Sequence, residues 1–139
     1  MNREIKFRGQ IIDSKEWVYG NLVKIDNGQC FIFNFHFIPA MSCPSEKFIE
    51  VKPETIGQFV GILDKANTEI YEGDFISTDL QRPYNKVIFK NGAFMVECFD
   101  DNLYHDIFFP TSHLQHTFCK YSKVIGNVID NPELDGVPS

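Results

Sequence analysis

The sequence predicts an all-β protein, and three observations support that class. Apolar and polar residues alternate with a period of two along much of the chain, as expected for half-buried strands. Phe, Tyr and Trp make up 14% of the 139 residues, and these side chains favour pleated sheet surfaces. Turn signals separate the strand patterns at short intervals. We therefore expect a small two-lobed fold of barrel type, with at most one or two short helices.

The first predicted turns define two successive hairpins. A polar cluster at residues 13–15 separates strand patterns at residues 6–8 and 16–20, which indicates the first turn. Residues 21–26 then lead into Asn27-Gly28. This dipeptide is typical of a two-residue turn in which both positions take positive φ. The sequence therefore predicts a second hairpin at this turn.

The strand after that turn is predicted to be long and aromatic. It is expected to run from Gln29 to Ile38. Side chains alternate across a strand, so every second residue lies on the same face. One face, the four-Phe face, must be buried against the rest of the chain or against a second copy, and we expect a homo-oligomer. It consists of Phe31, Phe33, Phe35 and Phe37.

The rest of the chain shows short strand patterns and few helix signals. Residues 53–55 fit a turn or one helical turn, and Asn91-Gly92 closes a third hairpin. Only Thr111 to Phe118 favours a short helix, with Ser112 at its N-cap. From Asp130 onward, the content of Pro, Asp and Gly predicts a frayed tail. Strands are expected at residues 48–51, 59–63, 70–71, 75–76, 86–89, 93–97 and 123–129.

These elements predict one domain, residues 1–139, with two lobes. We expect an N-terminal β lobe at residues 1–53 and an SH3-like barrel lobe at residues 54–129. Residues 130–139 are expected to form the tail.

The net charge of −6 disfavours nucleic acid as a partner. An acidic chain repels phosphates, and the 13 Lys and Arg residues are scattered singly along the sequence. Aromatic and basic residues around the third hairpin form the best candidate for a nucleic-acid-binding site. The favoured interpretation is that Phe89 lies in the core and that the lysines solubilise a strand edge. The candidate residues are Arg82, Tyr84, Lys86, Phe89 and Lys90.

The N-terminus and the cysteines indicate a cytoplasmic protein with no membrane segment. Residues 1–8 are charged and no apolar stretch follows them, so we predict no secretory signal. The longest nearly apolar run, residues 30–40, is about half the length of a membrane-spanning helix. The cysteines stand far apart and are expected to be free thiols in a reducing compartment. They are Cys30, Cys43, Cys98 and Cys119.

We predict no catalytic residues and no cofactor, and we expect the protein not to be an enzyme. In a helix, His113, His116 and Cys119 would share one face, which suits zinc. His105 lies nearby in the sequence. The spacing matches no common zinc motif, so surface histidines are the favoured interpretation. The pairs Ser112 with His113 and Cys119 with His116 lack the strained turn and oxyanion element of a nucleophile.

The most specific segments consist of turns and strand starts. Residues 55–65 read T-I-G-Q-F-V-G-I-L-D-K, and residues 69–76 read E-I-Y-E-G-D-F-I. Their glycines allow a bulge or a close approach of strands, and Gly73 is expected at positive φ in a sharp turn. We interpret a set of positions in these segments and in the last predicted strand as structural, and we call them the marked residues. They are Gly57, Gln58, Gly61, Asp64, Tyr71, Glu72, Gly73, Asp74, Gly126 and Asn127.

In these segments the sequence resembles the YopX family. The pattern T-[VI]-G-Q-[FY]-x-G-h-x-D-K fits residues 55–65, and I-Y-E-G-D-h-[IV] fits residues 70–76. The turn at residues 65–68 departs from the pattern, which usually has a glycine there. Asn67 is the residue of this turn best able to take the left-handed conformation. Further matches, which extend the resemblance nearly end to end, are residues 6–8, 17–20, 124–128 and 131–134.

The resemblance implies a phage or prophage origin and a β-rich fold, and it leaves the function open. Because no catalytic set is visible, we favour a non-enzymatic binding module that acts on a protein of the host or the phage. A nucleic-acid-binding accessory protein is one alternative. A metal-dependent enzyme is the other.

Overall fold

The computed structural model describes residues 4–34, 48–77, 84–98, 103–106 and 122–135, and these residues form an all-β structure. The predicted fold class is confirmed. Helical structure in the described residues is limited to the 3-10 turns η2 (Pro53–Thr55) and η4 (Pro132–Leu134). The strands are β1 (Phe7–Gln10), β2 (Trp17–Lys24), β3 (Cys30–Phe33), β4 (Phe48–Val51), β5 (Gly57–Leu63), β6 (Glu69–Tyr71), β7 (Asp74–Ser77), β8 (Asn85–Lys90), β9 (Ala93–Cys98), β10 (Leu103–Asp106) and β11 (Lys123–Asn127).

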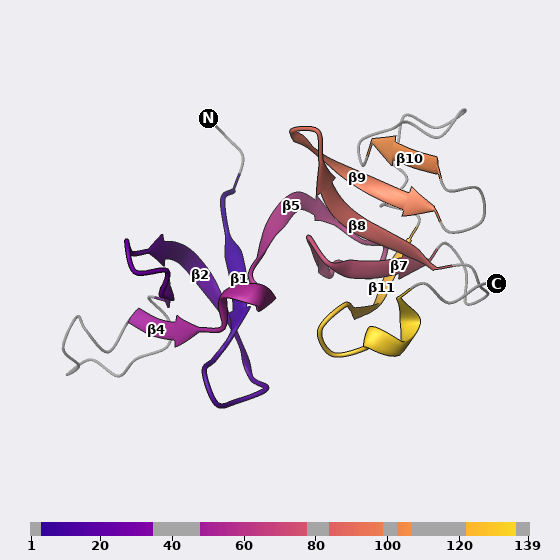
Figure 1. Ribbon diagram of the computed structural model, residues 1–139. Helices are drawn as coiled ribbons and strands as arrows, with labels where there is room; N and C mark the ends of the chain where they lie inside the picture. Colours follow the sequence, from indigo (N-terminus) through magenta and orange to yellow (C-terminus); the bar gives the residue numbers. More distant parts are fainter. Residues whose placement is uncertain (1–3, 35–47, 78–83, 99–102, 107–121, 136–139) are drawn as a thin grey trace. The chain divides into compact units, whose positions relative to one another are not determined.

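The strands form two sheets built from antiparallel pairs (Figure 1). The first sheet has the strand order β4-β3-β2-β1-β5-β6, and the second has the order β10-β9-β8-β7-β11. Neither sheet closes into a barrel among the described residues. The chain divides into two compact units, Met1–Phe59 and Val60–Ser139, and the division falls within β5. The single domain with a lobe boundary between residues 53 and 54, and the SH3-like character of the second lobe, stay predictions.

In the first unit, the sheet curls until β4 approaches the chain that follows β1. Ile11 bridges Val51 of β4, and the backbone amide of Lys52 donates to the carbonyl of Gln10 at 2.8 Å. A Cβ atom on Gly9 would lie only 2.9 Å from the Cβ atom of Val51. The absence of a side chain at this position of β1 therefore permits the close approach of the two strands.

The core of the first unit lies on the face of β3 that carries Cys30 and Ile32. Their exposure is 3% and 0%, whereas Phe31 and Phe33 on the opposite face are half-buried. The four-Phe face is thus not the core face, and its other two Phe residues lie outside the described residues. Its burial against a second copy stays a prediction. The core comprises Val18, Cys30, Ile32 and Val51, with Phe7, Ile11, Leu22, Ile49 and Ile56 packed against them.

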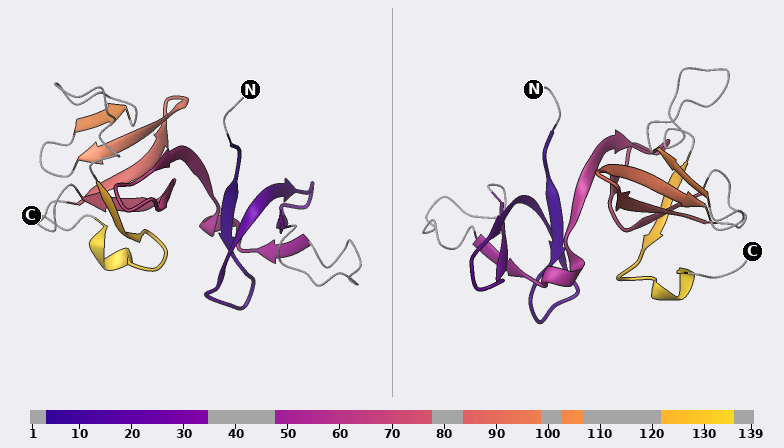
Figure 2. Two further views of the ribbon diagram at one scale, coloured as in Figure 1. Left: turned by 180° about the vertical axis from the view of Figure 1, so that it is seen from behind. Right: turned by 45° about the horizontal axis from the view of Figure 1, so that its top comes forward.

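Two layers of strands enclose the core of the second unit. One layer is β5 with β6, and the other is β7 with β8 and β9 (Figure 2). Every second side chain of these strands points into the core, as the period of two predicts. Phe94 and Val124 pack against this core from its margin. The buried residues are Val60, Ile62, Ile70, Ile76, Val87 and Val96.

The two Asn-Gly turns differ from each other. Asn91 and Gly92 both have positive φ, 52° and 81°, and they join the paired residues Lys90 and Ala93, as predicted. At Asn27-Gly28 only the glycine has positive φ, 93°, so the predicted two-residue turn is wrong. The amide of Gly28 donates to the carbonyl of Ile25, which makes a longer loop. Such a loop needs the left-handed conformation only at its last position.

Other elements differ from the prediction in extent. Strand β10 is not predicted, because its four residues follow a cluster of turn-forming acidic residues without a clear alternation. Residues 130–135, predicted to be a frayed tail, contain η4. The predicted helix at residues 111–118 lies outside the described residues. In the part of the chain that the structure describes, no helix is long and apolar enough to cross a membrane.

Candidate functional site

The outer face of the first sheet, opposite its core, gathers aromatic side chains from three strands. Cross-strand partners lie on the same face of a sheet. The register places Phe33 of β3 between Asn21 of β2 and Phe48 of β4. The neighbouring rows follow the same alternation. We call this surface the outer aromatic face, and its rings are Trp17, Tyr19, Phe31, Phe33 and Phe48.

Two rings of the outer aromatic face are exposed, and one of them is held by its neighbour. Tyr19 is 41% exposed and Phe48 is 42% exposed. The rings of Phe33 and Phe48 pack with centroids 4.8 Å apart and planes at 48°. A tilted aromatic pair at this distance contributes about 0.5–1.5 kcal/mol beyond burial. Phe48 is thus oriented before a partner binds, which lowers the entropic cost of forming a contact.

Arg8 lies at the β1 end of this face and is covered. Its guanidinium carbon is 4.7 Å from the centroid of the Trp17 ring, a cation–π geometry. Only 7% of Arg8 is exposed. The residue paired with it on β5 is Gly57, which has no side chain to occupy this space. The marked glycine at residue 57 therefore leaves room for a long side chain on the neighbouring strand.

The marked Asp64 organises the turn between β5 and β6. Its Oδ1 atom accepts hydrogen bonds from the amides of Ala66 and Thr68, both at 2.8 Å. Its Oδ2 atom accepts from the amide of Val124 in β11 at 2.9 Å. Asn67 has φ of 63°, so it takes the left-handed conformation predicted for it. Asp64 is 4% exposed, and its carboxylate accepts hydrogen bonds from backbone amides that hold the turn and β11.

The second marked segment forms the turn before β7. Gly73 has φ of 93°, as predicted, and its amide donates to the carbonyl of Val87 at 2.8 Å. The Oδ2 atom of Asp74 accepts from the amide of Tyr71 at 2.8 Å. The hydroxyl of Tyr71 lies 3.3 Å from Oε1 of Glu69, and the neighbouring Glu72 is half-buried. These groups shape the turn and bring β7 against β8.

The remaining marked residues also have structural roles, in strand pairing, in close approaches of the chain and in turns. Gly61, with φ of 94°, lies in the middle of β5, and Gln58 pairs with β1. A Cβ atom on Gly126 would lie 2.5 Å from Oδ1 of Asn131. The side chain of Asn127 accepts hydrogen bonds from the two amides at positions 129 and 130. None of these groups forms a cluster with an evident chemical role among the described residues.

The candidate residues for nucleic-acid binding are divided between two faces of β8. Side chains alternate along this strand, so Lys86 and Lys90 lie opposite to Phe89. Phe89 is 54% exposed, so the expectation that it lies in the core is wrong. It stands near the end of the hairpin, where its ring meets Phe94 edge-on at 5.2 Å. Arg82 lies outside the described residues.

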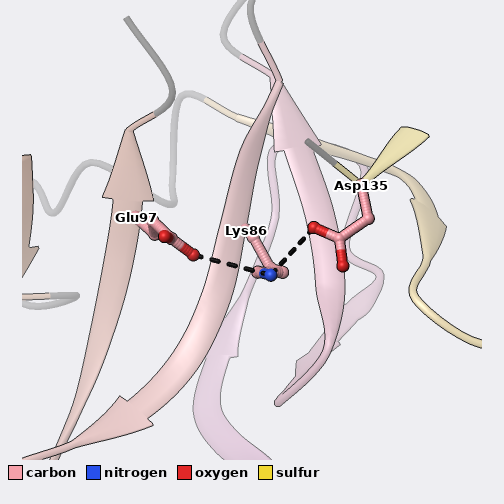
Figure 3. A network of polar contacts seen from close by, with 3 residues as sticks. All are labelled: Lys86, Glu97 and Asp135. Carbon is pink, nitrogen blue, oxygen red and sulfur yellow. Dashed lines mark hydrogen bonds and ion pairs between the residues drawn. The ribbon is translucent and has the colours of Figure 1, made fainter. Parts of the chain in front are cut away.

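Two carboxylates of the protein engage Lys86. Its Nζ atom lies 2.9 Å from Oδ1 of Asp135 and 3.6 Å from Oε2 of Glu97 (Figure 3). Burial lowers the pKa of Lys86, but the hydrogen bond and charge of Asp135 and the charge of Glu97 outweigh it and raise the pKa above its ordinary value. The protein itself neutralises this ammonium group, which weakens it as a phosphate ligand.

Of the four candidate metal ligands, His105 alone lies within the described residues. His105 lies in β10, paired with β9. His113, His116 and Cys119 lie outside the described residues. Within the described residues, no group of three or more His, Cys, Asp or Glu side chains could hold a metal ion. Cys30 is a free, buried thiol, as predicted, and the state of the other three cysteines stays a prediction.

Sequence reasoning missed three rings of the outer aromatic face, those of Trp17, Tyr19 and Phe48. A signal for two of them was present, because Trp17 and Tyr19 alternate with the buried Val18. The place of Phe48 depends on its pairing with Phe33, which only the register of β3 and β4 provides.

Comparison with known proteins identifies the family of this chain. A family model described as YopX protein matches residues 6–134, nearly the whole chain. No curated protein matches it. The chain therefore belongs to the YopX family, as the resemblance predicts.

Proposed function

We propose that this YopX-family protein is a non-enzymatic binding module of phage or prophage origin that acts on a protein partner in the cytoplasm. The outer aromatic face is the proposed binding surface. The observation that carries the proposal is the exposure of Tyr19 and Phe48 on one face of one sheet. Aromatic residues and Arg are enriched at protein interfaces, where a few of them dominate the binding energy.

The chemistry of the face favours a partner surface with apolar side chains and a polar margin. Phe33 and Phe48 offer flat apolar area, and the amide of Asn21 lies beside them in the same row. The hydroxyl of Tyr19 adds a polar group next to an apolar ring. This combination of an apolar centre with hydrogen-bonding groups beside it is typical of protein interfaces.

The two alternatives receive less support. A nucleic-acid accessory role would use Lys86 and Phe89, but these point to opposite faces of β8, and Lys86 is paired with carboxylates. A metal-dependent enzyme would use His113, His116 and Cys119, which lie outside the described residues. Self-association through the outer aromatic face would also cover its rings, and we treat it as a competing outcome of the test.

The test compares three proteins as bait in a lysate of phage-infected cells. They are the wild type, the double variant Tyr19→Ser with Phe48→Ser, and the control Phe89→Ser, which removes an exposed ring from the second unit. Circular dichroism and thermal unfolding establish that each is folded. We expect a protein that wild type and control capture equally and that the double variant captures at least about tenfold less, as for interface anchors.

Two results would overturn the proposal. Equal capture by all three proteins would remove the outer aromatic face as the binding surface. Native mass spectrometry that finds dimers of wild type and control, but monomers of the double variant, would identify a second copy as the occupant instead.

A further inference from the structure

The segment that follows β11 is attached at two separate points, at the turn before β7 and at β8 of the second sheet. At its start, the amide of Val128 donates to the carbonyl of Gly73 at 2.9 Å. At its end, the carboxylate of Asp135 accepts a hydrogen bond from the ammonium group of Lys86 at 2.9 Å (Figure 3). We call residues 128–135 the strap.

Between these two points, local hydrogen bonds organise the strap. The side-chain oxygen of Asn127 accepts from the amides of Ile129 and Asp130 at 3.0 and 2.8 Å. The amide of Asn131 donates to the carbonyl of Asn127 at 2.9 Å, and that of Leu134 to the carbonyl of Asn131 at 3.0 Å. The first three of these bonds join the strap to Asn127, the last residue of β11, and none of the four involves Lys86. The bonds of Asn127 hold the near half of the strap, whereas the single 3-10 turn at its far end depends on the attachment of Asp135 to Lys86.

The strap crosses the sheet beside a buried aromatic side chain. Phe75 of β7 pairs with Lys86 of β8, so both lie on the face opposite to the core residue Val87. Phe75 nevertheless has 0% exposure. Because Asp135 reaches Lys86, the end of the strap lies over the direct neighbour of Phe75.

The far attachment of the strap is open to water and ions. The side chain of Asp135 is 43% exposed and that of Lys86 is 20% exposed. Pairs with this exposure are worth less as salt screens the charges. Glu97 lies on β9 at 3.6 Å from the same ammonium group, so Lys86 keeps a carboxylate partner when Asp135 leaves. This second partner lowers the free-energy cost of releasing the strap.

We propose that the strap is a salt-sensitive cover, held by the Lys86–Asp135 pair, whose release exposes Phe75 and Lys86 on the outer face of the second sheet. This device is independent of the proposed binding function, because the outer aromatic face belongs to the first unit. It gives the second unit a closed state at low salt. An open state with one further apolar side chain on its surface becomes more populated as salt rises.

Hydrogen exchange of the full chain, resolved by NMR, tests the cover. In wild type, added sodium chloride is expected to speed exchange at the amides of Leu134 and Asp135. The variant Asp135→Asn is expected to exchange about two- to fivefold faster there at low salt, the range that an exposed ion pair supports. Its remaining salt dependence should be small. The matched control Glu97→Gln removes the partner that Lys86 keeps after release, and it should leave these amides at least as protected as in wild type.

A second readout concerns Phe75. A soluble paramagnetic agent should broaden its ring signals more at high salt than at low salt, while signals of the core residue Val87 stay unchanged. Strap amides that are insensitive to both salt and Asp135→Asn would overturn the proposal. Equal acceleration at every strand would also overturn it, since that indicates global unfolding. So would a Phe75 ring that stays protected while the strap opens.

Discussion

Asp64 and Val124 are 60 positions apart, and the amide of Val124 donates a 2.9 Å hydrogen bond to Oδ2 of Asp64. The other carboxylate oxygen accepts from the amides of Ala66 and Thr68 in the adjacent turn. The next amide, that of Lys65, donates to the carbonyl just before β11 at 3.0 Å. One buried carboxylate thus closes a turn and ties it to a strand from the far end of the chain.

We expect Asp64→Ala to destabilise the second unit by about 2–4 kcal/mol. The substitution leaves several backbone donors without their acceptor, and each such loss costs about 1–3 kcal/mol when the donor is buried. Asp64→Asn should cost less, since its amide oxygen can replace only one of the two carboxylate oxygens. Urea unfolding measures both values. The control Asp26→Ala, at an exposed turn, should change stability little, and a cost for Asp64→Ala no larger than that of the control would contradict this account.

Gly20 and Gly28 are glycines for two different physical reasons, a close approach of backbone at Gly20 and a positive φ at Gly28. A Cβ atom on Gly20 would collide with the backbone carbonyl of Phe33 on the neighbouring strand. A Cβ atom on Gly28 would meet nothing within 4 Å, but its φ of 93° is strained for other residues. We expect Gly20→Ala to cost about 3 kcal/mol or to prevent folding, through overpacking. Gly28→Ala should cost about 1 kcal/mol, through backbone strain. Equal midpoints in urea unfolding for the two variants would refute the distinction.

The turn at Asn67 predicts a graded response to substitution. Its φ of 63° is left-handed, and an asparagine tolerates this conformation better than most residues. We expect Asn67→Gly to change the free energy of unfolding by less than about 0.5 kcal/mol, because glycine adopts positive φ freely but costs more entropy on folding. Asn67→Ala should cost about 1 kcal/mol. Thermal unfolding of both variants tests this order, and an alanine variant as stable as wild type would reject it.

The sequence predicted strands and turns where local chemistry decides them. Gly73 and Asn67 lie at positive φ. Because few residue types tolerate that conformation, both positions could be recognised from residue type alone. The conformation of Asn27 could not, because loop length, rather than the Asn-Gly dipeptide, determines which positions become left-handed. Strand β10 also escaped prediction, since its pairing with β9 depends on a partner strand rather than on its own pattern.

The candidate site was only partly predictable for a related reason. Alternation in β3 gave two faces, but it did not show which one becomes the core. That choice follows from the curl of the sheet, in which Val51 and Ile32 fill the interior and Phe33 is left on the outside. The link between Lys86 and Asp135 spans 49 positions, and no spacing rule reports a contact over that distance.

Stability at alkaline pH should depend on Lys86. Its pKa is raised above the ordinary value of 10.5 by Asp135 and Glu97, which outweigh the opposing effect of burial. A base with a raised folded-state pKa contributes stability that is fully present below its unfolded pKa and is lost as pH rises through the folded pKa. The wild type should therefore lose stability relative to Lys86→Met as pH rises above 10.5. Below that pH the difference between the two should be constant.

Urea unfolding of both proteins in steps between about pH 9 and pH 12 measures this difference and cancels the titration of the tyrosines. A difference that is flat over the whole range would show that the ion pairs of Lys86 add nothing to the folded state.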